Sequence, residues 1–212
     1  AWCRSLIASS YGIYERYVLK NIDGLIFPCL KNGVHPFAGQ CRHVATVNNV
    51  PVLAETYDCY DPAVKKETGS ICHVGSLTYT RGITHLVKAA AQADCTLYLG
   101  GAFSPAAYQD EVLSLPEAAH TRYMGVLNRA QVMQLLQKSQ IGMATILNVG
   151  QYNQYDNLAT KVYEYMALGI PVILSRSSYN EKVTAQYDFG ICVDPANVDE
   201  IADAIRYLLD HP

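Results

Sequence analysis

The chain has 212 residues, of which half are apolar and 17% are charged. This is the composition of a folded globular protein, and it excludes a disordered chain. The formal net charge of −3 gives no general attraction to nucleic acid. No apolar run approaches the roughly 18 residues that a membrane-spanning helix needs.

The seven cysteines are odd in number and form no C-x-x-C pair. Cys72 and Cys95 fall in apolar, strand-like runs. We expect all seven to be reduced and buried in a cytosolic protein, with a secreted disulfide framework as the alternative. The chain begins with Ala1 rather than Met. We therefore expect it to be a fragment of a longer protein.

Residues 1–50 are predicted to form a helix followed by two buried strands, at 24–29 and 43–47. The helical stripe consists of Ile7, Tyr11, Tyr14 and Val18. This segment is too short to bury a core of its own, so we expect it to be the remnant of a separate lobe. Residues 51–69 lack periodicity and contain two prolines, which predicts a linker.

Beyond residue 70, short apolar runs alternate with segments of helical spacing. The predicted strands are 71–76, 95–100, 121–126, 141–146, 171–175 and 190–194. Most are apolar on both faces, as in parallel strands covered by helices on both sides. Residues 70–212 are therefore predicted to form an α/β domain with a doubly wound parallel sheet.

Open parallel sheets bind ligands beyond the carboxyl ends of their strands. The segment VGSLTYTRG (74–82) follows the first of these strands and places Arg81 at a predicted helix start. Backbone N–H groups and a guanidinium there would attract phosphate. A tight turn with a solvated arginine is the alternative.

A second candidate is the segment 155–173, where a polar loop runs into a short helix. Thr160, Lys161 and Glu164 would share one face of its first turn, with Tyr165 pointing elsewhere, towards the sheet. The carboxylate can grip a diol and the ammonium can neutralise a diphosphate. A surface ion pair is the alternative reading.

Two weaker candidates are the paired glycines of LGGAF (99–103) and the exposed backbone of MGV (124–126). No dinucleotide-binding glycine fingerprint, Walker A run or metalloprotease motif occurs. The histidines are scattered without ligand spacing. His73 lies inside a predicted strand, and we expect it to be a hydrogen-bonded core residue.

Five segments, in order and at the expected spacing, resemble the C-terminal half of a family-4-type glycosyltransferase of the GT-B fold. They are VGSLTYTRG, LYLGGAF, YMGVLNRAQVMQLLQKSQIGMA, NLATKVYEYMALGIPVILS and DFGICVDPANVDEIADAIRYLL. The resemblance covers residues 70–210, and KVYEYMALGIPVI is its most specific part. Residues 1–50 resemble the end of the family's first lobe.

The resemblance implies that Glu164 holds the ribose hydroxyls of a nucleotide sugar. Asp156 would contact the donor sugar, eight residues earlier, and is Asp where the family has Glu. Asn157 could share this role, and Thr160 lies at the same helix start.

The resemblance also assigns roles to the loops. Arg81 matches the phosphate-binding lysine of the family, and Lys161 would replace an arginine that is Ser76 here. Apart from the resemblance, Gly75 and Gly101 each follow a strand, where glycine permits close approach of a ligand to the backbone. The backbone at Val126 would read the base.

The implied activity is retaining transfer of a sugar, of the hexosyltransferase type and without a metal or cofactor, from a UDP-sugar to a saccharide or lipid-linked acceptor. We expect the fragment alone to be inactive, and the whole enzyme to work in the cytoplasm, peripheral to the inner membrane face in polysaccharide biosynthesis. A nucleotide-sugar 2-epimerase and a non-catalytic nucleotide-sugar-binding module are the alternatives.

Overall fold

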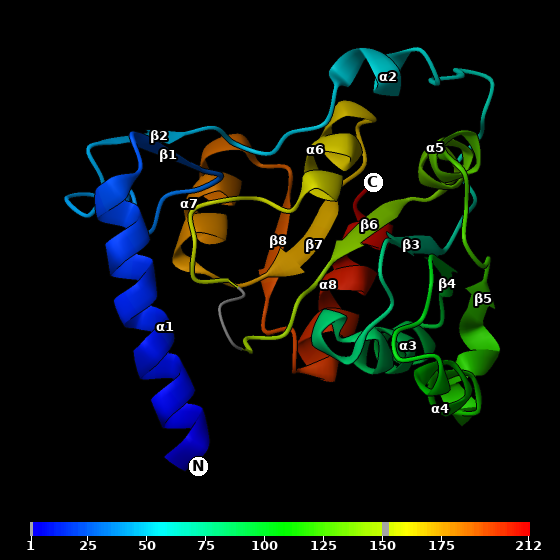
Figure 1. Cartoon of the computed structure of the whole chain (residues 1–212). Coiled ribbons are helices and arrows are strands. Elements are labelled where there is room, and N and C mark those ends of the chain that lie inside the picture. Colours follow the sequence, from blue (N-terminus) through cyan, green and yellow to red (C-terminus); the bar gives the residue numbers. More distant parts are fainter. Residues whose placement is uncertain (1, 150–152) are drawn as a thin grey trace. The chain divides into compact units, whose positions relative to one another are not determined.

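The computed structural model describes residues 2–149 and 153–212. The chain forms two compact units, each with its own parallel strands (Figure 1). The first contains residues 1–49 and 155–157, and the second contains residues 50–154 and 158–212. The assignment of these segments to a lobe remnant, a linker and a donor domain stays a prediction.

The first unit has one long helix and two short strands. They are α1 (Trp2–Asn21), β1 (Gly24–Phe27) and β2 (His43–Thr46), and the strands pair in parallel. The expectation of buried strands is wrong, because β2 is exposed throughout and β1 alternates between exposed and half-buried residues. The predicted helical stripe is also largely exposed, at Ile7, Tyr11 and Tyr14. A unit of this size has few apolar neighbours to cover these side chains.

The second unit is built on the predicted parallel sheet, whose six strands run in the order β5-β4-β3-β6-β7-β8. The strands are β3 (Ser70–Val74), β4 (Thr96–Gly100), β5 (Thr121–Tyr123), β6 (Ile141–Ala144), β7 (Val172–Ser175) and β8 (Gly190–Val193). Most end earlier than the sequence predicts. The chain leaves β3 at Gly75 and β5 just before Gly125, and both glycines have positive φ.

Helices connect the strands and cover both faces of the sheet. The α-helices are α2 (Leu53–Tyr57), α3 (Ile83–Gln92), α4 (Ala107–Leu113), α5 (Arg129–Lys138), α6 (Thr160–Ala167), α7 (Ser178–Tyr187) and α8 (Val198–Asp210). Two 3-10 turns, η1 (Tyr79–Arg81) and η2 (Pro116–His120), complete the set. Helix α2 lies in the segment 51–69, where the sequence predicts no regular structure.

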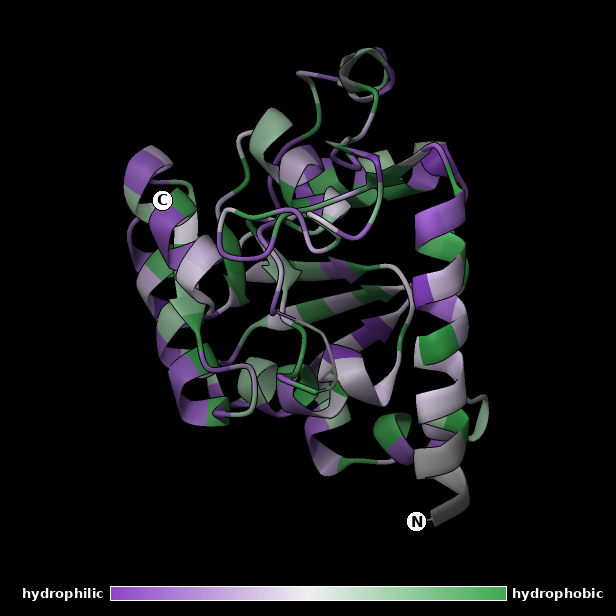
Figure 2. Ribbon diagram, turned by 60° about the vertical axis from the view of Figure 1, so that its left-hand side comes forward, coloured by the Kyte–Doolittle hydropathy of each residue, from purple (hydrophilic) through white to green (hydrophobic). Residues whose placement is uncertain are grey.

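The sheet separates two apolar clusters. One lies under α3, α4 and α8, and the other lies under α5, α6 and α7. Figure 2 shows the helices changing between hydrophobic and hydrophilic colours along their length, as expected where one face packs on a sheet. Helix α5 begins with a capping box, in which the Asn128 side chain accepts from the backbone N–H of Gln131 at 3.0 Å.

The strand order reverses between β3 and β6. Numbered from the first strand of the sheet, the order is 3-2-1-4-5-6, which is that of dinucleotide-binding folds. Neighbouring loops diverge to opposite faces at such a reversal, and the carboxyl ends of the two strands leave room for a ligand there. In this unit the position is the end of β3 beside β6.

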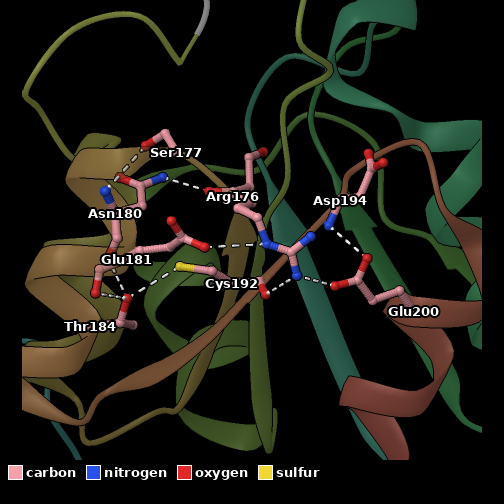
Figure 3. Close-up of polar contacts among 9 residues, drawn as sticks. Arg176, Ser177, Asn180, Glu181, Thr184, Cys192, Asp194 and Glu200 are labelled. Carbon is pink, nitrogen blue, oxygen red and sulfur yellow. Dashed lines mark hydrogen bonds and ion pairs between the residues drawn. The ribbon is translucent and has the colours of Figure 1, made fainter.

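A network of ion pairs and hydrogen bonds lies where β7 and β8 end, at the same carboxyl edge of the sheet (Figure 3). The Arg176 guanidinium pairs with both Glu181 and Glu200, and it donates to the carbonyl of Cys192 at 3.3 Å. The second carboxylate oxygen of Glu200 accepts from the backbone N–H of Asp194 at 3.1 Å. Arg176 thereby ties the start of α7 to the start of α8.

The described cysteines are free, and Cys29, Cys72 and Cys95 are buried as expected. Cys41, Cys59 and Cys192 are only half-buried, and the side chain of Cys3 lies outside the described part. Within residues 2–149 and 153–212, no helix is long and apolar enough to cross a membrane. In the same ranges, no group of three or more His, Cys, Asp or Glu side chains could hold a metal ion.

Candidate functional site

Helix α6 is anchored where the strand order reverses. The fully buried ring of Tyr165 lies against Gly142 of β6, where an added Cβ would come within 2.5 Å of the ring. The Tyr165 hydroxyl donates to the carbonyl of Cys72 on β3 at 3.5 Å. Because only glycine leaves room for this ring, the packing fixes the distance of α6 from the sheet.

Lys161 lies one turn before Tyr165 and therefore shares its face of α6. Its Nζ atom is 3.3 Å from Nε2 of His73 and borders Gly75, where an added Cβ would be 3.3 Å from Nζ. The expected division of α6 into a ligand face and a sheet face is therefore wrong for Lys161. The side chain reaches the sheet edge because it follows the direction of the Tyr165 ring.

Burial and a neighbouring cation together perturb the charge of Lys161. The pKa of Lys161 is lowered to about 7, first by burial and second by the charge of Arg81. Cys72 and Glu164 act in the opposite direction. Arg81 ends the 3-10 turn η1 rather than opening α3, and it is near enough for its charge to act on Lys161. Two neighbouring cations at a strand end favour an anionic ligand.

Glu164 does not pair with Lys161 but with Arg129, at the start of α5. The Arg129 Nη1 to Glu164 Oε1 distance is 2.6 Å, and Nη2 of Arg129 donates to the hydroxyl of Thr56 at 3.3 Å. The Glu164 side chain is only 15% exposed. Arg129 is a residue of this site that the sequence did not predict. The available signal was its position directly after the capping residue Asn128, where a helix start faces the sheet edge.

Glycines line the ends of three neighbouring strands. The N–H of Gly75 donates to the carbonyl of Gly100 at 2.9 Å, and the N–H of Gly101 donates to that of Gly125 at 2.7 Å. An added Cβ at Gly101 would lie 1.8 Å from the carbonyl oxygen of Gly75. These glycines thus allow the backbone segments after β3, β4 and β5 to pack directly on one another. The ends of these strands therefore carry few side chains.

The remaining predicted residues of the second unit border this edge. Ser76 follows Gly75 and is exposed, and Val126 follows Gly125 with 76% of its surface exposed. Thr160 is the first residue of α6 and is half-buried. These positions agree with access for a ligand, and their individual roles stay predictions.

Asp156 and Asn157 belong to the first unit. Asp156 pairs with Leu30, and its carboxylate accepts from the backbone N–H of Gly33 at 2.5 Å. Gly33 has φ of +77°, so this bond stabilises a turn that favours glycine. The contact gives Asp156 a structural role within its unit. Its predicted contact with the donor sugar stays a prediction.

Solved structures with the same fold are glycosyltransferases and a synthase. WaaG, a glycosyltransferase involved in lipopolysaccharide biosynthesis, is 14% identical over 94% of this chain and 58% of its own, with a TM-score of 0.66. Sucrose-phosphate synthase from Thermosynechococcus elongatus is 19% identical over 93% and 52%, with a TM-score of 0.65. Anabaena Alr3699/HepE in complex with UDP and glucose is 15% identical over 79% and 47%, with a TM-score of 0.59.

The chain thus spans about half the length of these structures. No curated protein sequence matches it. The family described as glycosyl transferases group 1 matches residues 61–212, which include the whole six-stranded sheet with α3 to α8. The chain therefore belongs to the glycosyl transferases group 1 family and contains the Rossmann-like sheet of a GT-B glycosyltransferase.

Proposed function

We propose that this chain carries the donor site of a retaining glycosyltransferase that uses a UDP-sugar. The observation that carries the proposal is the position of Lys161 at the strand reversal, beside the backbone of Gly75 and within range of the charge of Arg81. A diphosphate needs this combination of positive charge and close access. Family membership and the UDP and UDP-glucose bound by Alr3699/HepE support the choice of ligand.

The proposed chemistry is stabilisation of the leaving group. As the sugar leaves, negative charge develops on the diphosphate. Lys161, Arg81 and the backbone at Ser76 would bind that charge more strongly in the transition state than in the ground state. The mechanism requires no metal ion, and the acceptor is a saccharide or a lipid-linked saccharide. The fragment would bind the donor and transfer nothing without the rest of the enzyme.

The other residues complete the proposed donor site. Glu164 would accept from the ribose hydroxyls, since Arg129 bonds to only one of its carboxylate oxygens. The backbone at Val126 would read the base, and Thr160 would line the approach to the diphosphate. Asp156, with Asn157, would contact the sugar. The whole enzyme would act in the cytoplasm, on the inner membrane face when the acceptor is lipid-linked.

Calorimetric titration of the chain with UDP-glucose, uridine and ADP tests the proposal. UDP-glucose should bind more tightly than ADP. Glu164→Gln should weaken both UDP-glucose and uridine by about 1–3 kcal/mol, because both carry the ribose diol. Asp210→Asn removes an exposed carboxylate at the end of α8 and serves as the matched control. Unchanged affinity in Glu164→Gln would remove the ribose assignment.

Transfer itself is measured with the full-length protein, an isotopically labelled donor and a saccharide acceptor. Retention predicts a product with the donor's anomeric configuration, read by proton NMR. Release of UDP together with an epimerised free sugar would indicate a 2-epimerase. Donor binding without any turnover would indicate a binding module.

A further inference from the structure

His73 lies next to Lys161 at the proposed diphosphate site. Its side chain is fully buried within β3. The Nδ1 atom is 3.2 Å from the carbonyl oxygen of Met143 on β6, and the Nε2 atom is 3.3 Å from Nζ of Lys161. The ring thus bridges the two strands at the reversal point and the first turn of α6.

The contacts define the protonation of the ring. Burial lowers the pKa of His73 well below its ordinary value, and the charges of Lys161 and Arg81 lower it further, so the ring is neutral at pH 7. The backbone at Met143 and Ser76 acts in the opposite direction. A carbonyl oxygen only accepts, so the proton belongs on Nδ1. Nε2 then carries a lone pair that faces the ammonium of Lys161.

We propose that His73 is a positioning residue whose Nε2 accepts a hydrogen bond from Lys161 and holds that ammonium beside Gly75, ready for the diphosphate of a nucleotide sugar. The inference rests on the proposed function. A lysine side chain has four rotatable bonds, and an acceptor fixed in the sheet removes much of that freedom before the ligand arrives. Gly75 leaves the space that the ammonium occupies.

The chemistry of the partner matters as much as its position. A carboxylate at this place would cancel the charge of Lys161, whereas a neutral imidazole orients the charge and leaves it intact. Glu164 lies three residues away on α6, but it is held by Arg129 instead. Among the ion pairs of residues 2–149 and 153–212, none involves Lys161. The two pairings together keep the cation available for an anionic ligand.

The test is a double-mutant cycle on UDP-glucose binding, measured by calorimetry. His73→Leu should weaken binding about tenfold when Lys161 is present, and should cause no further loss in a Lys161→Met background. Uridine, which lacks the diphosphate, should bind equally to all four proteins. His73→Gln restores an acceptor oxygen and should recover most of the affinity. Equal losses in both backgrounds would show that His73 acts only on the fold, and no loss in either would overturn the inference.

A second measurement is independent of any ligand. Nitrogen-15 NMR of the His73 ring should show a neutral ring with the proton on Nδ1 from pH 6 to 8.5, and Lys161→Met should change the Nε2 resonance. A proton on Nε2 or a charged ring would contradict the proposed bond. If the ring behaves as expected but the unaltered chain does not bind UDP-glucose, the proposed function fails and the His73–Lys161 bond stands.

Discussion

Two cations lie at the same edge of the sheet in opposite electrostatic settings. Arg176, where β7 ends, forms ion pairs with the carboxylates of Glu181 and Glu200 (Figure 3). Lys161, beside the end of β3, faces a neutral imidazole and the charge of Arg81. The charge of Arg176 is neutralised by contacts that stabilise the fold. The charge of Lys161 is not neutralised by an ion pair with any described residue and is available to a ligand. The sign of the local charge balance, rather than the presence of a cation, separates a structural contact from a binding site.

The largest expected effect is a loss of stability at the glycine-rich ends of β3, β4 and β5, which border the Lys161 site. Gly101→Ala would place a Cβ 1.8 Å from the carbonyl oxygen of Gly75, at a φ of +140° that side chains rarely adopt. We expect a loss of about 3 kcal/mol or more in the free energy of unfolding, measured by urea denaturation. The matched control is Gly12→Ala on α1, whose Cβ would meet nothing within 4 Å. Equal stability of the two variants would argue against the close packing.

Lys161→Met should change affinity and stability in opposite directions. Loss of a charged hydrogen-bond donor should weaken UDP-glucose binding by about 1.5–3 kcal/mol in calorimetry. The apolar side chain removes a half-buried charge, so the free energy of unfolding below pH 7 should rise by about 1–3 kcal/mol. Lys182→Met removes an exposed lysine of α7 and should alter neither quantity. A variant that loses both affinity and stability would indicate that Lys161 is structural, like Arg176.

Affinity for UDP-glucose should fall as the pH rises. The pKa of Lys161 is lowered from 10.5 to about 7, with Arg81, Cys72, Glu164 and His73 as the titratable or charged neighbours. The ammonium is therefore charged at pH 6 and mostly neutral at pH 8.5. We expect binding about tenfold weaker at pH 8.5, measured by calorimetry at constant ionic strength. A nucleotide sugar is the correct probe, because a terminal phosphate monoester itself titrates near pH ~6.

The stability of the fold should show the opposite dependence in the same pH range. Between pH 7 and 10.5 the unfolded chain binds the proton of Lys161 more readily than the folded chain does. The contribution of Lys161 to the free energy of unfolding therefore rises with pH across this window. The difference between the unaltered chain and Lys161→Met should shrink accordingly. An affinity that does not change with pH would contradict the position assigned to this ammonium.

The smallest expected effect belongs to the structural cation. Arg176→Met should lower the free energy of unfolding by about 1 kcal/mol, because the network is exposed and solvent weakens its ion pairs. Its affinity for UDP-glucose should equal that of the unaltered chain. Thermal unfolding with and without ligand measures both quantities in one experiment. A large loss of affinity would erase the distinction between the two clusters.

The sequence predicts the sheet well because burial on both faces leaves a direct pattern of apolar runs. The six strands and the capping box at Asn128 follow from short-range rules. The contacts of the candidate site do not. His73 and Lys161 are 88 residues apart, and Arg129 and Glu164 are 35 apart. Neither pairing has a local signal, because each depends on how α6 packs against the sheet.

The first unit shows the opposite limit. The helical spacing of apolar residues in α1 and the alternation in β1 predict which residues can be buried. Burial also needs a partner surface. Ile7 and Tyr11 have the right spacing and remain exposed in the described structure. Periodicity therefore identifies an element more reliably than its surroundings.

The contact between Tyr165 and Gly142 links recognition to the interior of the protein. Any side chain at position 142 would push the aromatic ring outward, and with it the helical turn that bears Lys161. The packing of the hydrophobic core therefore sets the distance of the ammonium from the sheet. The sequences of the loops beyond the strands can vary without changing this distance. Substitutions in those loops can therefore change the sugar that is accepted while diphosphate binding is preserved, provided that Tyr165 stays packed against Gly142.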